Sequence, residues 1–415
     1  MAQTTIDMDD ADAAKKANAF NMFAIPEGYL ADPYPWFRLL RDHDPVHENP
    51  DGSLLITRYA DVKEVWRDLT AVVDKRDQFR AKFGEGPLLE HHTTGMLFRD
   101  PPDHDRLRAI VNPFFATQSV ASLRPVVEKL TRDLLDSFED GVEIEFVGDV
   151  AFKLTIAVIC NMLGVPVEDG NRIQQYGKRL LYPLNPSVSA QDIADGHEAV
   201  ALFKDYLAGH LARVRSQARV DGSANILSAL VDAERRGADI SETEILHMCI
   251  IALNGGHEST TNLIAMSIHM LLEHPDQLAL FRAAGDDIHV AIEELIRFIS
   301  PIQFQGRRIT RPTTLSGTDI APNTEIVFGV ASANHDDRVF DAPERLDLTR
   351  KPNAHIGFGA GVHVCIGRAL AKLETSIVLP AVMRHFPRIE RAGPALYAPS
   401  IRFRGLSALP LRLYR

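Results

Sequence analysis

The stretch HIGFGAGVHVCIGRALAKLE, residues 355–374, contains four glycines, two histidines and Cys365, one of only three cysteines in the chain. A cysteine that only packs does not need glycines around it, whereas a sulfur that must stay open to a flat, bulky partner does. Gly359, Gly361 and Gly367 lack a Cβ and permit positive φ, which lets the backbone approach such a ligand closely.

Cys365 directly precedes a segment with apolar residues at helical spacing, which predicts a helix over about 366–386. A sulfur at a helix N-terminus meets free N–H groups and the positive end of the helix dipole, and both stabilise a thiolate. The alternative, a buried and inert cysteine, is the commoner role for a lone cysteine. We assign that role to Cys160 and Cys249, which lie in apolar helical segments.

Composition and length limit the possible classes of protein. The chain has 415 residues, 45% of them hydrophobic, and no repeat or linker that would divide it. We therefore expect one large domain over residues 26–415, after a loosely ordered segment over residues 1–25.

The three cysteines are far apart and lack metal-site spacing, as is typical of a reduced intracellular chain. The N-terminus is not a signal peptide, and no apolar run could span a bilayer. The net charge of −11 argues against nucleic-acid binding. We expect a cytoplasmic monomer that binds neither nucleic acid nor a membrane.

The hydrophobic periodicity predicts a mainly α chain with a small β part. Strands are expected at SLLITR, over 302–330 and over 401–415, and a loop-rich stretch over 331–364. Short helices are expected at 34–43 and 59–69, and longer ones at 119–138, 148–164, 168–183, 191–218, 223–236, 242–274 and 287–299.

The segment FGAGVHVCIG resembles the Phe-x-x-Gly-x-x-x-Cys-x-Gly motif of the cytochrome P-450 family, matching at Phe358, Gly361, Cys365 and Gly367. Four further segments resemble family motifs in the expected order: DPPDHDRLR, LNGGHESTTN, EELIR and APERLD. The resemblance runs from about residue 30 to the C-terminus. It implies the cytochrome P-450 fold, with haem b between the long central helix and the helix that follows Cys365. Cys365 would be the axial ligand of the iron.

The resemblance also implies which residues contact haem. His104 and Arg108 share one face of a helix that starts near Pro101, and taken alone they would be an exposed polar stripe. By resemblance they meet a haem propionate, as do Arg307 and His363. Gly255 is expected beside the cofactor, although it and Gly256 could instead allow close helix packing.

Glu294 and Arg297 lie three residues apart and so share a helix face. Most such pairs are solvated surface pairs. The resemblance instead implies a buried Glu–Arg–Arg cluster, completed by Arg345, that holds the cysteine loop in place.

Glu258 and Ser259 stand where the family usually has an acid followed by threonine. A carboxylate and a hydroxyl at these positions would relay protons, and serine lacks the methyl group that fixes the rotamer of threonine. Thr260 is the neighbouring alternative. The resemblance implies O2 as co-substrate and oxidation, chiefly hydroxylation, of a small hydrophobic substrate.

Electrons would come from NAD(P)H through a separate ferredoxin-type iron–sulfur protein and its reductase. Arg106, Arg368 and Lys372 either form the docking patch for that partner or are ordinary solvated side chains.

The substrate pocket is assigned by position alone. Among its candidates Asn254, Gln303 and Gln305 are polar, so either they face away or the substrate carries oxygen functions. Arg402 is expected to point outward. The candidates are Phe83, Leu88, Leu89, His92, Thr94 and Leu97 in an expected loop over 79–98, with Leu181, Tyr182, Ile251, Asn254, Gln303, Phe304, Gln305 and Phe403.

Three other functions were weighed: a peroxide-driven haem-thiolate peroxygenase, a haem-binding sensor without turnover, and a helical scaffold without haem. The Glu258–Ser259 pair argues against the first two, because proton-relay residues serve O2 activation.

Overall fold

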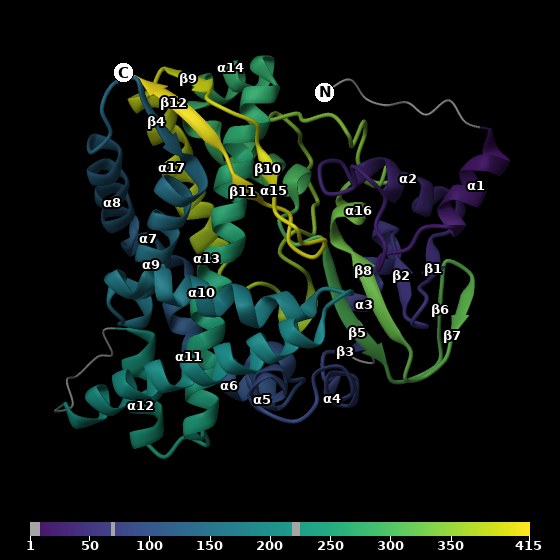
Figure 1. The fold of residues 1–415 in the computed structure, drawn as a ribbon, viewed down its shortest axis with the longest axis horizontal. Coiled ribbons are helices and arrows are strands. Elements are labelled where there is room, and N and C mark those ends of the chain that lie inside the picture. Colours follow the sequence, from purple (N-terminus) through teal and green to yellow (C-terminus); the bar gives the residue numbers. More distant parts are fainter. Residues whose placement is uncertain (1–8, 68–70, 218–224) are drawn as a thin grey trace.

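The computed structural model describes residues 9–67, 71–217 and 225–415, and helices dominate it (Figure 1). Its mainly α architecture with small sheets confirms the expected fold class. The helices are α1 (Asp10–Asn18), α2 (Tyr34–His43), α3 (Tyr59–Arg67), α4 (Arg76–Phe83), α5 (Pro87–Thr94), α6 (Asp103–Phe115), α7 (Thr117–Ser122), α8 (Arg124–Asp136), α9 (Lys153–Leu163), α10 (Gly170–Leu181), α11 (Ala190–Ser216), α12 (Ile226–Arg235), α13 (Glu242–Glu273), α14 (Pro275–Ala283), α15 (Ile288–Ile299), α16 (Val330–Asn334) and α17 (Arg368–His385).

Within the described residues, a mixed sheet with strand order β1-β2-β8-β5-β3 lies beside the helices (Figure 1). β2 and β8 are parallel, and the other neighbours in this sheet are antiparallel. A second sheet has the order β4-β12-β9, and β6-β7 and β10-β11 are hairpins. The strands are β1 (Val46–Glu48), β2 (Leu54–Ile56), β3 (Ala71–Val72), β4 (Val142–Glu145), β5 (Phe304–Ile309), β6 (Thr313–Leu315), β7 (Thr318–Ile320), β8 (Glu325–Gly329), β9 (Arg388–Arg391), β10 (Leu396–Tyr397), β11 (Leu406–Ala408) and β12 (Pro410–Tyr414).

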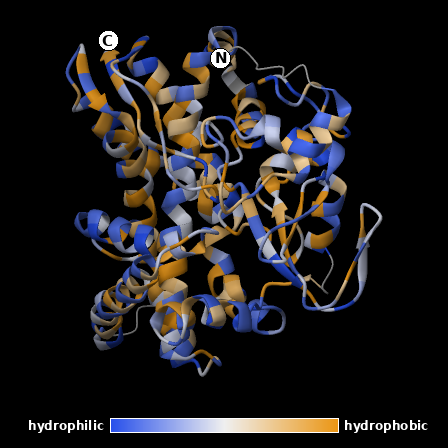
Figure 2. Ribbon diagram, turned by 45° about the vertical axis from the view of Figure 1, so that its right-hand side comes forward, coloured by the Kyte–Doolittle hydropathy of each residue, from blue (hydrophilic) through white to orange (hydrophobic). Residues whose placement is uncertain are grey.

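The long helix α13 is the central element of the fold, and α9, α11, α15 and α17 contact it. It begins with a capping box, in which the Ser241 side chain accepts from the N–H of Glu244 and the Glu244 carboxylate accepts from the N–H of Ser241. Hydrophobic residues gather on the central helices in Figure 2, as expected for a helix that is covered on several sides. Among the residues described, no helix combines the length and the apolar character that crossing a membrane requires.

Several expected boundaries need correction. Residues 10–18 form α1, which Asp9 caps and which buries Ala13 and Ala17, instead of being loosely ordered. The expected loop over 79–98 contains most of α4 and all of α5, because Gly86 ends the preceding turn and Pro87 starts a new helix. Helix α14 was not predicted, and α16 lies in the stretch expected to be loop. Parts of the expected helices 59–69, 191–218 and 223–236 lie outside the described residues.

The two glycines in the middle of α13 face different surroundings. A Cβ on Gly256 would lie 2.5 Å from Ile159 of α9, so this glycine allows the two helices to pack closely. A Cβ on Gly255 would meet no atom within 4 Å, and Gly255 is exposed although it is in the middle of a buried helix. Gly256 therefore serves packing, whereas Gly255 faces open space inside the molecule.

This difference predicts opposite effects of alanine at the two positions. Gly255→Ala should raise the free energy of unfolding by about 0.5–1 kcal/mol, because alanine favours a helix and has room here. Gly256→Ala should lower it by about 1–3 kcal/mol through overpacking against Ile159. Urea unfolding of the two variants measures both changes, and equal responses would contradict the assignment.

Candidate functional site

The cysteine loop is held by a close backbone approach to α3. Gly361 has φ 69°, and a Cβ there would lie 2.3 Å from the carbonyl oxygen of Trp66. Gly359 has φ 74° and lies against the Trp66 ring. The N–H of Cys365 donates to the Phe358 carbonyl at 2.9 Å, which closes the loop just before α17. The glycines at these positions are thus required by conformation and by space.

The Cys365 side chain is accessible to solvent, yet burial raises the pKa of its thiol. This combination indicates a sulfur that faces an open space within the molecule. The N–H groups of Gly367 and Arg368 and the guanidinium groups of Arg108 and Arg368 act to lower the same pKa. A metal ion bound to the sulfur would complete this stabilisation of the thiolate.

Four basic side chains lie beside this loop: His104, Arg108, Arg307 and His363. The ring centroids of His104 and His363 lie 4.3 Å apart. Arg108 donates to the carbonyls of Val362 and Val364 at 3.0 and 2.7 Å, and Arg307 donates to the carbonyl of Gly306 at 2.9 Å. The elements that supply them are α6, β5 and the cysteine loop.

This cluster fits an anionic partner. Nε2 of His363 is buried without a hydrogen bond, since Asp100 Oδ1 lies 3.9 Å away. Burial lowers the pKa of Arg307 to about 10, as expected for a cation that its surroundings do not fully compensate. Carboxylates of a flat ligand would supply the missing charge. With the accessible sulfur of Cys365, these residues form the donor set that haem requires.

One face of α13 is open to the interior. Ile251, Gly255, Glu258 and Ser259 on or beside this face are not buried, whereas Thr260 is only 4% exposed. Thr260 follows Gly256 by four residues and therefore lies on the side that packs against α9. The geometry thus separates the two candidate hydroxyl groups and brings only Ser259 to the open face.

The acid of this pair has a histidine beside it. Oε2 of Glu258 lies 3.8 Å from Nε2 of His257, and the Glu258 side chain is 25% exposed. Burial is the main cause that lowers the pKa of His257. The Glu258 carboxylate therefore reaches solvent, while burial favours the neutral form of His257.

The pocket candidates from α4 and α5 mostly serve packing. His92 is buried among Phe79, Phe83 and Phe98, and its Nδ1 lies 2.9 Å from the Leu88 carbonyl. Leu88 packs against Gly196 of α11 and Leu89 is buried, while Leu97 and Tyr182 are exposed. Thr94 and Leu181 are half-buried.

The three polar pocket candidates do not all point toward the same side. The amide of Gln303 donates to the Ser300 carbonyl at 2.6 Å, and Oδ1 of Asn254 would lie 2.4 Å from a Cβ at Gly177 of α10. Both therefore face away from the open side of α13. Gln305 shares a strand face with Arg307, because side chains alternate along β5.

Two expected directions were wrong. Phe304 makes an edge-to-face contact with Phe37 of α2, at 5.7 Å between ring centroids, and so points away from the expected pocket. Arg402 does not point outward, since its Nε is buried. Phe403 beside it is half-buried and pairs with Ile302 across an isolated bridge.

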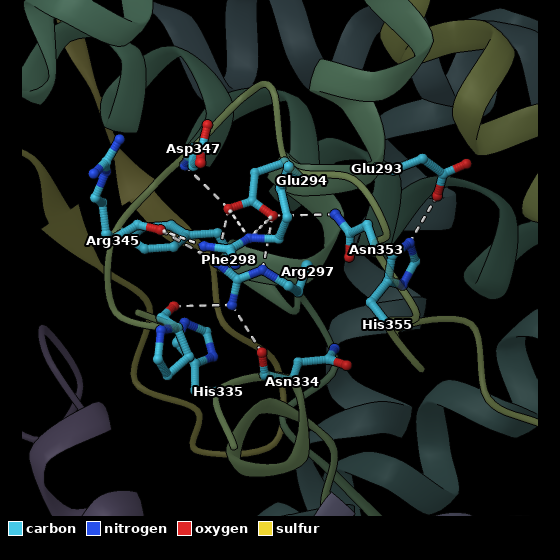
Figure 3. A network of polar contacts seen from close by, with 12 residues as sticks. Glu293, Glu294, Arg297, Phe298, Asn334, His335, Arg345, Asp347, Asn353 and His355 are labelled. Carbon is cyan, nitrogen blue, oxygen red and sulfur yellow. Dashed lines mark hydrogen bonds and ion pairs between the residues drawn. The ribbon is translucent and has the colours of Figure 1, made fainter. Parts of the chain in front are cut away.

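The Glu294–Arg297 pair is fully buried, as expected. Its carboxylate receives two hydrogen bonds from the guanidinium, at 2.7 and 2.8 Å. Arg297 also donates to the carbonyls of Asn334 and Pro343, and Asn353 donates to Glu294 at 3.1 Å (Figure 3). The pair therefore holds the irregular chain that leads to the cysteine loop.

Arg345 is not the third charged member of this network. Its side chain is exposed and points away from Glu294 (Figure 3), and only its backbone carbonyl takes part. The third cation is Arg350, whose Nε donates to both oxygens of Glu294 at 3.2 and 3.1 Å. A turn after Arg345 reverses the chain, so a residue five positions later reaches the carboxylate. The sequence offered no pattern that distinguishes the two arginines.

The expected docking patch is also partly wrong. Arg106 is paired with Glu244 at 2.6 Å, and Lys372 forms an ion pair with Glu293. Arg368 is exposed and lines a surface cavity of about 410 Å³ with Lys351 and Lys372. Basic groups therefore remain beside the cysteine loop, but Arg106 is neutralised.

The comparisons with known proteins agree with this site. The Cytochrome P450 family matches residues 46–283 and 288–390. Cytochrome P450 107B1 of Saccharopolyspora erythraea is 32% identical over 94% of this chain and 98% of its own length. Vitamin D(3) 25-hydroxylase of Pseudonocardia autotrophica is 32% identical over 93% of this chain and 94% of its own. The solved structure of P450BioI with an acyl carrier protein carrying hexadec-9Z-enoic acid has a TM-score of 0.87 at 28% identity, covering 93% of this chain and all of that one.

The chain belongs to the cytochrome P450 family. It is a cytochrome P450 monooxygenase, an oxidoreductase whose family uses haem b and O2.

Three features of the site escaped prediction from sequence: Arg350, Asn353 and the contact of Trp66 with the glycines of the cysteine loop. Of these three features, only the Trp66 contact had a signal in the sequence, because Trp66 is one of only two tryptophans in the chain.

The network predicts a graded loss of stability. Glu294→Ala should lower the free energy of unfolding by about 3–5 kcal/mol, because it leaves Arg297 buried without its counter-ion. Arg350→Ala should cost about 1–3 kcal/mol through lost charged hydrogen bonds. The matched control Arg345→Ala should stay within about 0.5 kcal/mol, since its side chain is exposed. Thermal or urea unfolding measures the series, and a larger loss for Arg345→Ala than for Arg350→Ala would refute the reassignment.

Proposed function

We propose that this chain binds haem b through the Cys365 thiolate and hydroxylates a small hydrophobic substrate with O2. Its electrons come from NAD(P)H through a separate ferredoxin-type iron–sulfur protein and its reductase. The accessible sulfur of Cys365 beside a cluster of incompletely neutralised basic groups is the observation that carries the proposal. Arg108, Arg307, His104 and His363 hold the haem carboxylates.

When bound, thiolate-ligated haem supplies the electron-rich iron that favours cleavage of the O–O bond. The chain's own residues control protons and water. Glu258 takes a proton from solvent, and Ser259 Oγ passes it along the open face of α13. Gly255 leaves room beside that hydroxyl, and the apolar packing of α4 and α5 excludes bulk water.

The relatives do not single out a substrate. One is named for vitamin D3, and another was solved with a fatty acid on an acyl carrier protein. These names support a hydrophobic substrate class. The cavity lined by Arg368 and Lys351 supports a docking face for an acidic electron donor.

The two alternative functions, peroxygenase and haem-binding sensor, predict different results in an activity assay. A peroxygenase would form product with hydrogen peroxide alone, and a sensor would form none under any condition. Glu258 and Ser259 favour the monooxygenase, which should require NAD(P)H, ferredoxin and reductase together.

Replacement of the proposed axial ligand tests the assignment directly. Cys365→His should abolish the thiolate-specific Soret band of the reduced carbon monoxide complex, because imidazole donates less charge to iron than thiolate does. The absorbance spectrum of the purified variant provides the measurement. An unchanged thiolate spectrum would remove Cys365 from the site and overturn the proposed function.

Ser259 should assist proton delivery without holding the cofactor. Ser259→Ala should leave haem content nearly intact but lower the product formed per NAD(P)H consumed, with hydrogen peroxide rising instead. Ser259→Thr should preserve or improve this ratio, because the added methyl group fixes the rotamer.

Thr260→Ala is the matched control, since that side chain lies on the α9 side of α13. It should leave the product ratio unchanged. If Thr260→Ala uncouples the reaction while Ser259→Ala does not, the relay uses the other hydroxyl.

A further inference from the structure

Basic side chains gather where helix α4, the sheet and the turn 400–403 meet. Lys75 is the N-cap of α4, and its ammonium forms an ion pair with Glu325 of β8. Lys82 lies in the last turn of α4. Arg402 accepts a hydrogen bond from the N–H of Gln303 at its backbone oxygen, 2.8 Å away. These cations come from parts of the chain that are distant in sequence.

Asn185 joins Lys82 to the turn that carries Arg402, because its carbonyl accepts from the Lys82 ammonium at 2.7 Å and its Oδ1 accepts from Ser400 Oγ at 3.0 Å. Burial is the largest cause that lowers the pKa of Lys75 and brings that of Lys82 to about 8, and repulsion from Arg402 acts in the same direction on both. Burial likewise brings the pKa of Arg402 to about 10. Lys82 and Arg402 are half-buried, and repulsion between the cations adds to the effect of burial on their pKa values.

The cluster has fewer negative partners than positive charges. Glu325 neutralises Lys75, and Lys82 donates only to the carbonyl oxygen of Asn185, at 2.7 Å. Among the described residues, the Arg402 guanidinium has no hydrogen-bond or ion-pair partner, and its Nε is buried. Glu325 is the carboxylate that acts on Arg402, and it is already paired with Lys75. A partly buried cation without a partner of its own is costly, which indicates that an anion belongs here.

Aromatic side chains adjoin the cluster. The Lys75 ammonium lies 5.2 Å from the ring centre of Phe79, and that of Lys82 lies 5.9 Å from the ring centre of Phe83. His92, in the same aromatic group, has its pKa lowered to about 3 by burial, with Arg402 and Lys82 adding repulsion. A ligand with one anionic end and an apolar body would match both surroundings.

The cluster is continuous with the candidate haem site. The turn that carries Arg402 pairs with the chain that enters β5, the strand of Arg307, through the Gln303 N–H and the bridge between Ile302 and Phe403. Repulsion from Arg402 also contributes to the lowered pKa of Arg307. The turn that carries Arg402 is tied to the connection between α10 and α11, because Ser400 Oγ donates to Asn185 Oδ1 at 3.0 Å. The cations therefore lie where α4, the start of β5 and the α10–α11 connection meet.

We propose that Arg402 and Lys82 form a subsite for the carboxylate of an apolar organic acid, and that such acids are substrates. The guanidinium matches a carboxylate in geometry, and the adjoining aromatic rings suit a hydrocarbon body rather than free phosphate. This inference rests on the proposed function and specifies its substrate class.

The test compares acids with their uncharged analogues. The haem-loaded protein is titrated with octanoic, dodecanoic and hexadecanoic acids and with their methyl esters, and binding is followed by calorimetry and by the haem absorbance. At least one acid should bind more tightly than its ester. Arg402→Gln should weaken binding of that acid by about ten-fold or more and leave the ester unchanged, because one charge-assisted contact is lost. Lys82→Gln should act in the same direction.

Arg311→Gln is the matched control, since Arg311 is exposed in the turn between β5 and β6. It should change neither affinity. Equal affinity for acid and ester in the unmodified protein, or an acid preference that survives Arg402→Gln, would overturn the proposal. If Arg402→Gln loses haem, the same comparison in Lys82→Gln decides.

The carbon monoxide spectrum of the same samples separates the two hypotheses. A thiolate spectrum together with equal binding of acid and ester would contradict only the proposed carboxylate subsite. Loss of the thiolate spectrum, with tighter calorimetric binding of the acid than of its ester retained, would contradict only the proposed function.

Discussion

The buried pair of Glu294 and Arg297 is the interaction on which the rest of the site depends. Both side chains are fully shielded, so each requires the other, and their remaining donors and acceptors must find partners in the protein. Those partners are backbone and side-chain groups between residues 334 and 353, a stretch with little regular structure of its own. The pair thus supplies the hydrogen bonds that a helix or sheet would otherwise provide. The cysteine loop follows directly.

Two glycines mark the most closely packed contacts of the site. The cysteine loop approaches the Trp66 carbonyl too closely for any side chain at Gly361, and α13 approaches α9 too closely for one at Gly256. In contrast, α4, α5 and the α10–α11 connection meet through side chains, hydrogen bonds and ion pairs. The proposed substrate subsite lies among these side-chain contacts, so the proposal places recognition and the sulfur in different parts of the chain.

The partners of the arginines distinguish their roles. Arg297 has a carboxylate and belongs to the scaffold, whereas Arg108 and Arg307 donate to backbone carbonyls and retain charge for an anion. Arg402 has neither, although the chain as a whole carries a net charge of −11. Because enclosed positive charge is costly in an acidic protein, its persistence near the site indicates anionic ligands.

The sequence by itself determined the helical class, the long helix near 242–273 and the cysteine motif, because periodicity and glycine requirements are local properties of the chain. It also placed Glu294 and Arg297 on one face. Only the tertiary structure decided between Arg345 and Arg350, which of Ser259 and Thr260 is buried, and which of Gly255 and Gly256 contacts another helix. Each choice depends on which side of a loop or helix is covered by a segment distant in sequence. The local sequence pattern gives the directions of side chains relative to one another. Which of these side chains becomes buried depends on the distant segment that packs against it.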